Sequence, residues 1–152
     1  MELKKYQQTT LDTLKTYLKE ANKFGPKHAF ISVSGKSYNE DYFGSEVPFV
    51  CIKIPTGGGK TLVGCNAINL IMESLLTEKL GKGIVVWFVP SEAIKTQTLK
   101  KFRDRKDPHR KILDESFDNN IKIFSNEEAL KISKSDVSEN LCIIVLSLDA
   151  FR

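Results

Sequence analysis

Apolar residues in the first part of the chain recur mostly at steps of three or four positions. Between residues 3 and 21 they are Leu3, Tyr6, Leu11, Leu14, Tyr17, Leu18 and Ala21. This spacing predicts an amphipathic helix, which Phe24-Gly25-Pro26 would end. The short apolar run 29–33 predicts a strand, and the polar, glycine-punctuated residues 34–46 predict a loop.

Later apolar residues form continuous runs. These runs are Pro48–Ile52, Ile84–Val89 and Leu141–Leu146, and Ile121–Phe124, which contains Lys122, predicts a further short strand. Such runs are typical of strands buried on both faces of a parallel sheet. Between them the pattern predicts helices over 62–78, 91–105, 108–117 and 127–132, and a polar loop over 134–140. Three of these helices have a candidate N-cap: Ser91, Asp107, and Ser125 with Glu128 as its capping-box partner. Strands that alternate with helices predict an α/β protein with a mainly parallel sheet.

The run Pro55-Thr56-Gly57-Gly58-Gly59-Lys60-Thr61 joins the first continuous apolar run to a long helical segment. Three consecutive glycines let the backbone fold back and turn its N–H groups inward. The positive end of the following helix dipole faces the same place. Lys60 adds a cation and Thr61 a hydroxyl suited to Mg²⁺. This loop therefore predicts a site for ATP and Mg²⁺, with Thr61 as the metal ligand. Its predicted binding residues are Thr56, Gly57, Gly58, Gly59, Lys60 and Thr61.

One position departs from the strict phosphate-loop pattern. That pattern has a glycine five positions before Gly59, where this sequence has Ile54. The core Gly57-x-Gly59-Lys60-Thr61 is intact. The alternative is a glycine-rich turn that ends in Lys-Thr by chance, but the predicted strand before it and helix after it favour the phosphate loop.

The composition is that of a globular domain, with 41% hydrophobic and 28% charged residues in 152. No apolar run reaches the length of a membrane span, and the N-terminus lacks an apolar signal core, so we expect a cytoplasmic protein with no membrane partner. The three cysteines form no CxxC pair and have no histidine cluster beside them. We expect them to be reduced, buried thiols.

Positive charge is concentrated in one stretch. Residues 95–111 contain eight basic and two acidic side chains, a net charge of +6, although the whole chain carries only +4. This stripe favours a polyanionic partner, and a solvated helix face is the alternative.

Three further segments resemble known motifs. Pro90-Ser91-Glu92-Ala93-Ile94-Lys95-Thr96-Gln97 resembles motif Ia of superfamily 2 helicases, and Tyr6-Gln7-Gln8 resembles the aromatic-Gln element upstream of their motif I. The glycine loop has the form that motif I takes in helicase-type ATPases. Ser147 to Arg152 looks like the motif that precedes the DExx box. In this order the chain resembles the ATPase part of type III restriction enzyme Res subunits and related DEAD/DEAH-box proteins.

The resemblance implies a RecA-like P-loop domain, a three-layer α/β/α fold with a mainly parallel sheet. Residues 1–46 would form the helix and loop that precede motif I, and residues 47–152 would carry motif I, motif Ia and the strand before the DExx box. Gln7 or Gln8 would contact adenine, although a surface glutamine is an equal alternative. The residues implied to contact nucleic acid, with DNA expected, are Pro90, Ser91, Lys95, Thr96, Gln97 and Arg152.

The resemblance also implies carboxylates that this sequence does not supply. Phosphoryl transfer to water needs one to hold Mg²⁺ and one to position water, and the family places both in a DExx box after a buried strand. Here Asp149 lies in the preceding motif, and Asp114-Glu115 lies in a helical pattern where we expect solvated side chains. We therefore expect no identifiable catalytic residue, weak ATP binding and no turnover. We also expect an incomplete sheet, which indicates a truncated piece of a longer polypeptide whose remainder would be a partner.

Three functions remain open at this point. The first is the ATP-binding N-terminal part of a nucleic-acid-dependent ATPase, which the resemblance implies is a Res subunit working with a modification (methyltransferase) subunit. The second is a non-catalytic nucleic-acid-binding or interaction module that keeps the loop. The third is a small P-loop kinase, which is disfavoured because no arginine-rich lid follows.

Overall fold

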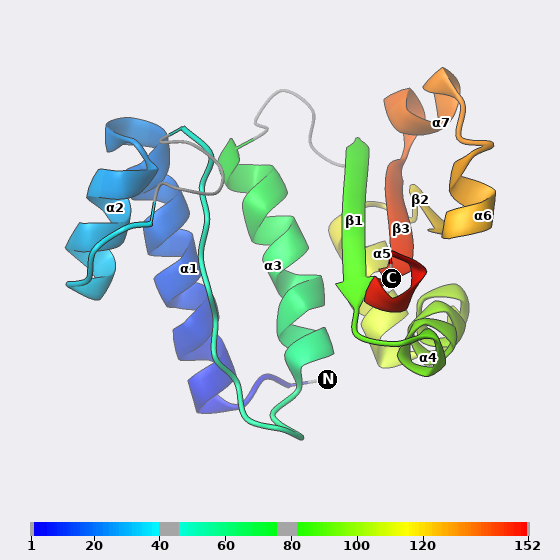
Figure 1. The fold of residues 1–152 in the computed structure, drawn as a ribbon, viewed down its shortest axis with the longest axis horizontal. Coiled ribbons are helices and arrows are strands. Elements are labelled where there is room, and N and C mark those ends of the chain that lie inside the picture. The colour runs from blue at the N-terminus through cyan, green and yellow to red at the C-terminus, as the bar shows by residue number, and fades with distance from the viewer. Residues whose placement is uncertain (1, 40–45, 76–81, 152) are drawn as a thin grey trace. The chain divides into compact units, whose positions relative to one another are not determined.

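The computed structural model describes residues 2–39, 46–75 and 82–151, and the chain forms two compact units, Met1–Thr77 and Glu78–Arg152. The first unit contains three helices: α1 (Lys5–Phe24), α2 (Pro26–Ser34) and α3 (Lys60–Leu75) (Figure 1). Gly25 separates α1 from α2 with a positive φ of 84°, and its N–H closes α1 on the Ala21 carbonyl. Pro26 then starts α2 at a position where its missing N–H is not needed.

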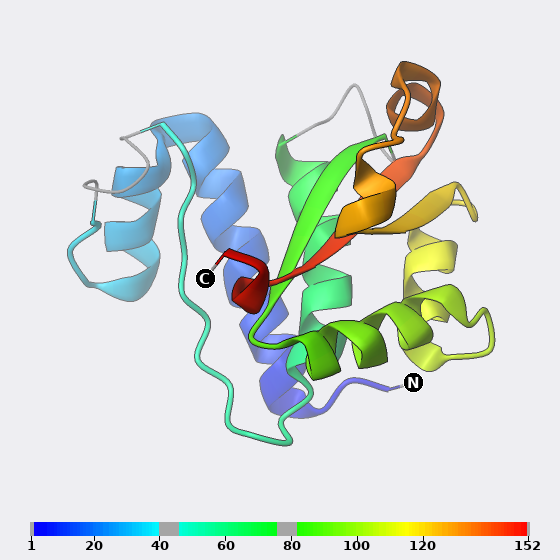
Figure 2. The same ribbon diagram turned by 45° about the vertical axis from the view of Figure 1, so that its right-hand side comes forward.

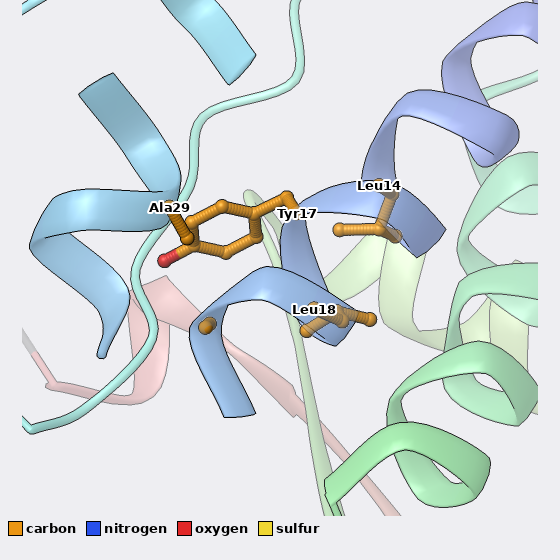
Figure 3. Packing of buried hydrophobic residues seen from close by; sticks show 5 residues of the cluster. Leu14, Tyr17, Leu18 and Ala29 are labelled. Carbon is orange, nitrogen blue, oxygen red and sulfur yellow. The ribbon is translucent and has the colours of Figure 1, made fainter. Parts of the chain in front are cut away.

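The core of the first unit lies along α1. Leu14, Tyr17, Leu18 and Ala21 form one cluster with Ala29 of α2. Figure 3 shows the Tyr17 ring reaching toward Ala29, while Leu14 and Leu18 point to the other side of the helix. A second cluster joins α1 to the glycine-loop segment and to α3 through Leu11, Ile54 and Val63. The predicted helical periodicity is therefore confirmed.

Two strands predicted for this unit are wrong. Residues 29–33 belong to α2, because Ala29 packs on Tyr17 across two adjacent helices. Residues 48–55 run without regular secondary structure. A strand needs a hydrogen-bonded neighbour, and the described residues of this unit contain no strand to pair with. Within this segment Cys51 is exposed, contrary to the expectation of a buried thiol.

The second unit is built on a parallel sheet of three strands: β1 (Gly83–Val89), β2 (Ile121–Ser125) and β3 (Leu141–Ser147). The order is β1-β3-β2, with Ile84 opposite Cys142 and Ile121 opposite Leu141. The connecting helices are α4 (Glu92–Arg103), α5 (Pro108–Ser116), α6 (Asn126–Ala129) and α7 (Lys134–Glu139), and the 3-10 helix η1 (Leu148–Phe151) follows β3. Figure 2 shows α4 and α5 on one side of the sheet and α6 and α7 on the other. The predicted α/β class with a parallel sheet is confirmed.

Burial differs between the central and the outer strand. β3 lies in the middle, and its residues Leu141, Cys142, Ile143 and Val145 are fully buried. On the α4 side of β1, Val89 is buried and Trp87 is half-buried, packed edge-on against Phe102 with ring centroids 5.2 Å apart. Its other side carries Ile84, Val86 and Phe88, which are about half exposed. The expected burial on both faces is confirmed for β3 and wrong for β1, which borders the described sheet.

Capping explains the short helices of this unit. The predicted capping box of α6 is present, since Ser125 Oγ accepts from Glu128 N and the Glu128 carboxylate accepts from Ser125 N at 2.7 Å. The predicted polar loop over 134–140 is wrong, because it contains α7. Ser133 and Asp136 form a second capping box there, with Ser133 N donating to Asp136 Oδ2 at 2.8 Å. The hydrophobic pattern did not predict this helix, because the helix is marked by its capping residues and not by an apolar face.

In the described ranges, no helix combines the length and apolar character that a membrane crossing requires.

Candidate functional site

The glycine loop has a backbone that only glycine allows. Gly57 and Gly59 have φ values of 75° and 78°, in the left-handed region. Gly58 is restricted by space, because a Cβ there would lie 2.5 Å from Ile54 Cγ2 and 2.9 Å from the Pro55 carbonyl oxygen. Its N–H donates to that same Pro55 oxygen at 3.0 Å, which closes a tight turn. The three glycines are therefore required by the fold of the loop itself.

The loop leads directly into α3. The carbonyl of Gly59 accepts the N–H of Val63 at 3.0 Å, so helical hydrogen bonding starts at the last glycine. The first N–H groups of a helix have no partner within it and carry the positive end of its dipole. Lys60, the first helical residue, is exposed and its Nζ donates to the Pro55 oxygen at 3.0 Å. Thr61 follows it, half-buried, in the first turn.

These features fit a triphosphate. A cradle that side chains would fill, free helix N–H groups and a cation folded over the loop are the donors that phosphate oxygens accept from. Thr61 supplies the hydroxyl that could ligate Mg²⁺. These groups all come from one continuous segment, Gly57 to Thr61.

The first turn of α1 holds the loop. Tyr6 Oη and Gln7 Nε2 both donate to the Gly58 carbonyl oxygen, at 2.8 and 2.9 Å. Gln7 is only 4% exposed, whereas Gln8 is exposed and donates to Asp12. Of the two glutamines considered, Gln7 is the one beside the loop, and its contact with adenine stays a prediction. Sequence reasoning missed the role of Tyr6, whose only signal was its place beside Gln7.

The predicted motif Ia segment begins α4 in the second unit. Ser91 caps this helix, and its Oγ accepts from Ile94 N at 3.4 Å. Pro90, Thr96 and Gln97 are exposed there. Arg152 lies outside the described residues.

Lys95 is placed differently from its predicted neighbours. It is 8% exposed, and its ammonium lies 2.7 Å from Glu92 Oε2 and 2.9 Å from Asn126 Oδ1. Glu92 also accepts a hydrogen bond from Ser147 at the end of β3. The bond to Lys95, and then the bond to Ser147, hold the pKa of Glu92 below its ordinary value. Lys95 therefore ties α4 to the strand ends, and a nucleic-acid phosphate would have to compete with a carboxylate for it.

The basic stripe divides into paired and exposed residues. Arg103 pairs with Glu128, and Arg110 is buried with its Nε 2.8 Å from Asp114 Oδ1. Arg110 also donates to the Phe102 carbonyl oxygen at 2.9 Å, which fixes the corner between α4 and α5. Five other basic residues of the stripe are exposed at or near this corner: Lys100, Lys101, Arg105, Lys106 and Lys111. We call these five the basic corner.

Asp114 corrects one expectation. It was expected to be solvated, but it is 9% exposed and paired with Arg110. The pattern could have indicated this, because Arg110 and Asp114 are four residues apart on one helix face. Over the described parts of the chain, no group of three or more His, Cys, Asp or Glu side chains could hold a metal ion.

The family model for the type III restriction enzyme, res subunit, matches residues 1–150. The chain belongs to this family. No curated protein and no solved structure gave a match. Membership in the Res-subunit family supports the helicase-like ATPase class and agrees with the loop–helix geometry at Gly57–Thr61.

Proposed function

We propose that this chain is the ATP-binding N-terminal part of a nucleic-acid-dependent ATPase, a helicase or translocase, and specifically of a Res subunit that acts on DNA. The observation that carries the proposal is the glycine loop, with its two left-handed glycines and Lys60 at the start of α3. Residues 1–152 would belong to the first RecA-like domain. The partners would be DNA, the rest of the polypeptide and a modification subunit.

ATP would be held by the residues predicted from the sequence. The N–H groups of Gly57 and Gly59 would face the phosphates, and Gly58, whose N–H donates to the Pro55 carbonyl oxygen, would keep the turn closed beside them. Lys60 would leave the Pro55 carbonyl to neutralise the phosphates, and Thr61 would ligate Mg²⁺. Bound Mg²⁺ would supply charge neutralisation of the phosphates.

DNA contact would use the second unit. Thr96 and Gln97 present exposed polar side chains near the start of α4, which follows Pro90 and the capping residue Ser91. The basic corner adds five exposed cations. Each phosphate neutralised by such a cation releases counterions, so binding should weaken steeply with salt. Lys95 would act here by positioning α4, because its ammonium is already paired.

The structure offers no acidic pair for hydrolysis at Asp114, since this carboxylate is buried against Arg110. We therefore propose that the 152-residue chain binds ATP weakly and does not turn it over, with or without DNA.

Titration of the chain with a fluorescent ATP analogue and Mg²⁺ tests the proposal. We expect weak, saturable binding that Lys60→Ala reduces by about tenfold or more, since a charge-assisted phosphate contact contributes roughly 1.5–3 kcal/mol. Lys53→Ala is the matched control, because Lys53 is exposed in the same segment before the loop turns. Equal loss in both variants, or no binding by the unmodified chain, would contradict the ATP site. ATP turnover that Lys60→Ala abolishes would contradict the absence of hydrolysis.

A non-catalytic nucleic-acid-binding module is the second candidate, and the basic corner favours it. DNA binding that is unchanged by ATP and by Lys60→Ala would support this alternative.

A further inference from the structure

One carbonyl of the glycine loop receives two side-chain hydrogen bonds from the same helix turn. Tyr6 Oη and Gln7 Nε2 donate to the Gly58 oxygen at 2.8 and 2.9 Å, across more than fifty residues of sequence. Such a carbonyl has two lone pairs, and both have a donor here. The position of this one oxygen is therefore fixed by α1 and not by the loop alone.

The amide orientation of Gln7 follows from its two partners. Lys4 N can only donate, and it lies 2.8 Å from Gln7 Oε1. The Gly58 oxygen can only accept, and it lies 2.9 Å from Nε2. An inverted amide would oppose donor to donor and acceptor to acceptor. With 4% exposure, Gln7 is an internal link between the start of α1 and the loop.

Contact between Gln7 and the loop is close. A Cβ at Gly59 would lie 2.5 Å from Gln7 Nε2, so no side chain fits between them. Because the peptide between Gly58 and Gly59 is planar and trans, its C=O and N–H point in opposite directions. Holding the Gly58 oxygen toward α1 therefore turns the Gly59 N–H away from α1 and prevents this peptide from flipping.

We propose that Tyr6 and Gln7 are positioning residues which orient the Gly58–Gly59 peptide for phosphate binding, and that this role is independent of the nucleotide base. The inference rests on the proposed ATP site, because it names what keeps that site in shape. Neither side chain needs to touch the nucleotide for this role. Loss of either donor lets the peptide rotate and lowers affinity for any ligand that binds through its phosphates.

The first test needs no ligand. Amide hydrogen exchange of residues 55–61 is measured by mass spectrometry in the 152-residue chain and in Gln7→Ala, Tyr6→Phe and Gln8→Ala. We expect exchange of this segment to accelerate about tenfold in Gln7→Ala, the factor for a lost hydrogen bond of about 1.4 kcal/mol, and less in Tyr6→Phe, which keeps one donor. Gln8→Ala is the matched control, because Gln8 is exposed and its amide donates to Asp12 of the same helix. Unchanged loop exchange in Gln7→Ala, with an intact α1, overturns the proposal.

The second test separates positioning from base recognition. Affinities for ATP, GTP and inorganic tripolyphosphate, each with Mg²⁺, are compared in the same variants. We expect Gln7→Ala to weaken all three by a common factor of about ten, and Gln7→Glu to fail in the same way, since a carboxylate cannot donate to the Gly58 oxygen. A loss confined to ATP overturns the base-independent role and assigns Gln7 to adenine. If the unmodified chain binds none of the three, the proposed ATP site fails, while the exchange experiment still decides whether Tyr6 and Gln7 hold the loop.

Discussion

Removing one partner of the buried pair Arg110–Asp114 should strongly destabilise the second unit. Arg110 Nε lies 2.8 Å from Asp114 Oδ1, and the two side chains are 7% and 11% exposed. Arg110 Nη1 also holds the Phe102 carbonyl at 2.9 Å. Replacing Arg110 with Met keeps the apolar stem but leaves a buried carboxylate without its partner.

The expected loss is large. Breaking a buried ion pair from one side costs about 3–5 kcal/mol, because the remaining charge stays desolvated. A unit of this size is stabilised by only about 4–11 kcal/mol, at the usual contribution per residue. Both Arg110→Met and Asp114→Asn should therefore bring the unit close to unfolding. The double variant Arg110→Met/Asp114→Leu should lose much less than the sum, since it leaves no unpaired charge.

Trp87 provides the assay. It is the only tryptophan in the chain and packs edge-on against Phe102, whose carbonyl Arg110 holds. Urea titration followed by Trp87 fluorescence should show midpoints lowered by about 1.5–5 M in the single variants, at an m-value of about 1–2 kcal/mol per M. Single losses below about 1 kcal/mol, or strictly additive losses in the double variant, would refute the reasoning for a buried pair.

Three further predictions address the loop, the strand ends and the basic corner. Gly58→Ala should weaken ATP-analogue binding by about tenfold or more. The alanine Cβ would meet Ile54 and Pro55, and overpacking of this kind costs about 1–3 kcal/mol. Affinity equal to that of the unmodified chain would contradict the steric argument. Glu92→Gln should destabilise the second unit most above pH 4.5, because a carboxylate with a depressed pKa stabilises the fold only while it is ionised. In an acid titration, the stability difference between variant and unmodified chain should shrink as the pH falls through the lowered pKa of Glu92. A stability difference that does not change with pH would show that Glu92 acts by packing. Replacing Lys101 and Lys106 with Gln should reduce the salt dependence of DNA binding by a slope of about 0.9 for each phosphate that the variant no longer neutralises, whereas an unchanged slope in fluorescence anisotropy would remove the basic corner from the interface.

The sequence predicted much of the local backbone structure of the loop. Gly57 and Gly59 have a left-handed backbone, which agrees with the expectation that consecutive glycines let the chain fold back, and the helix after the loop begins at Lys60, two residues before the predicted start at 62. These features could be predicted because a phosphate loop is a local structure, in which neighbouring residues determine the backbone. The caps at Asp107 and Ser125 were predictable for the same reason.

Features that depend on distant partners were not predictable from the pattern. The run Pro48–Ile52 has the composition of a strand, but a strand forms only where another strand supplies hydrogen bonds. Ile84–Val89 is as apolar as Leu141–Leu146, yet only β3 is buried on both faces, because the order β1-β3-β2 places it in the middle.

Side-chain roles divide in the same way. The sequence placed Gln7, Lys95 and Asp114 among polar groups, and their residue types alone favoured contact with ligand or solvent. In the folded chain, Lys95 and Asp114 are instead paired with other side chains inside the second unit. Gln7 donates a hydrogen bond to the Gly58 carbonyl. Local sequence thus determined the glycine loop at which we propose that a triphosphate binds, since a tight turn followed by a helix needs only adjacent residues. Packing decided which polar groups stay available, because burial and pairing depend on segments that meet only in the folded chain.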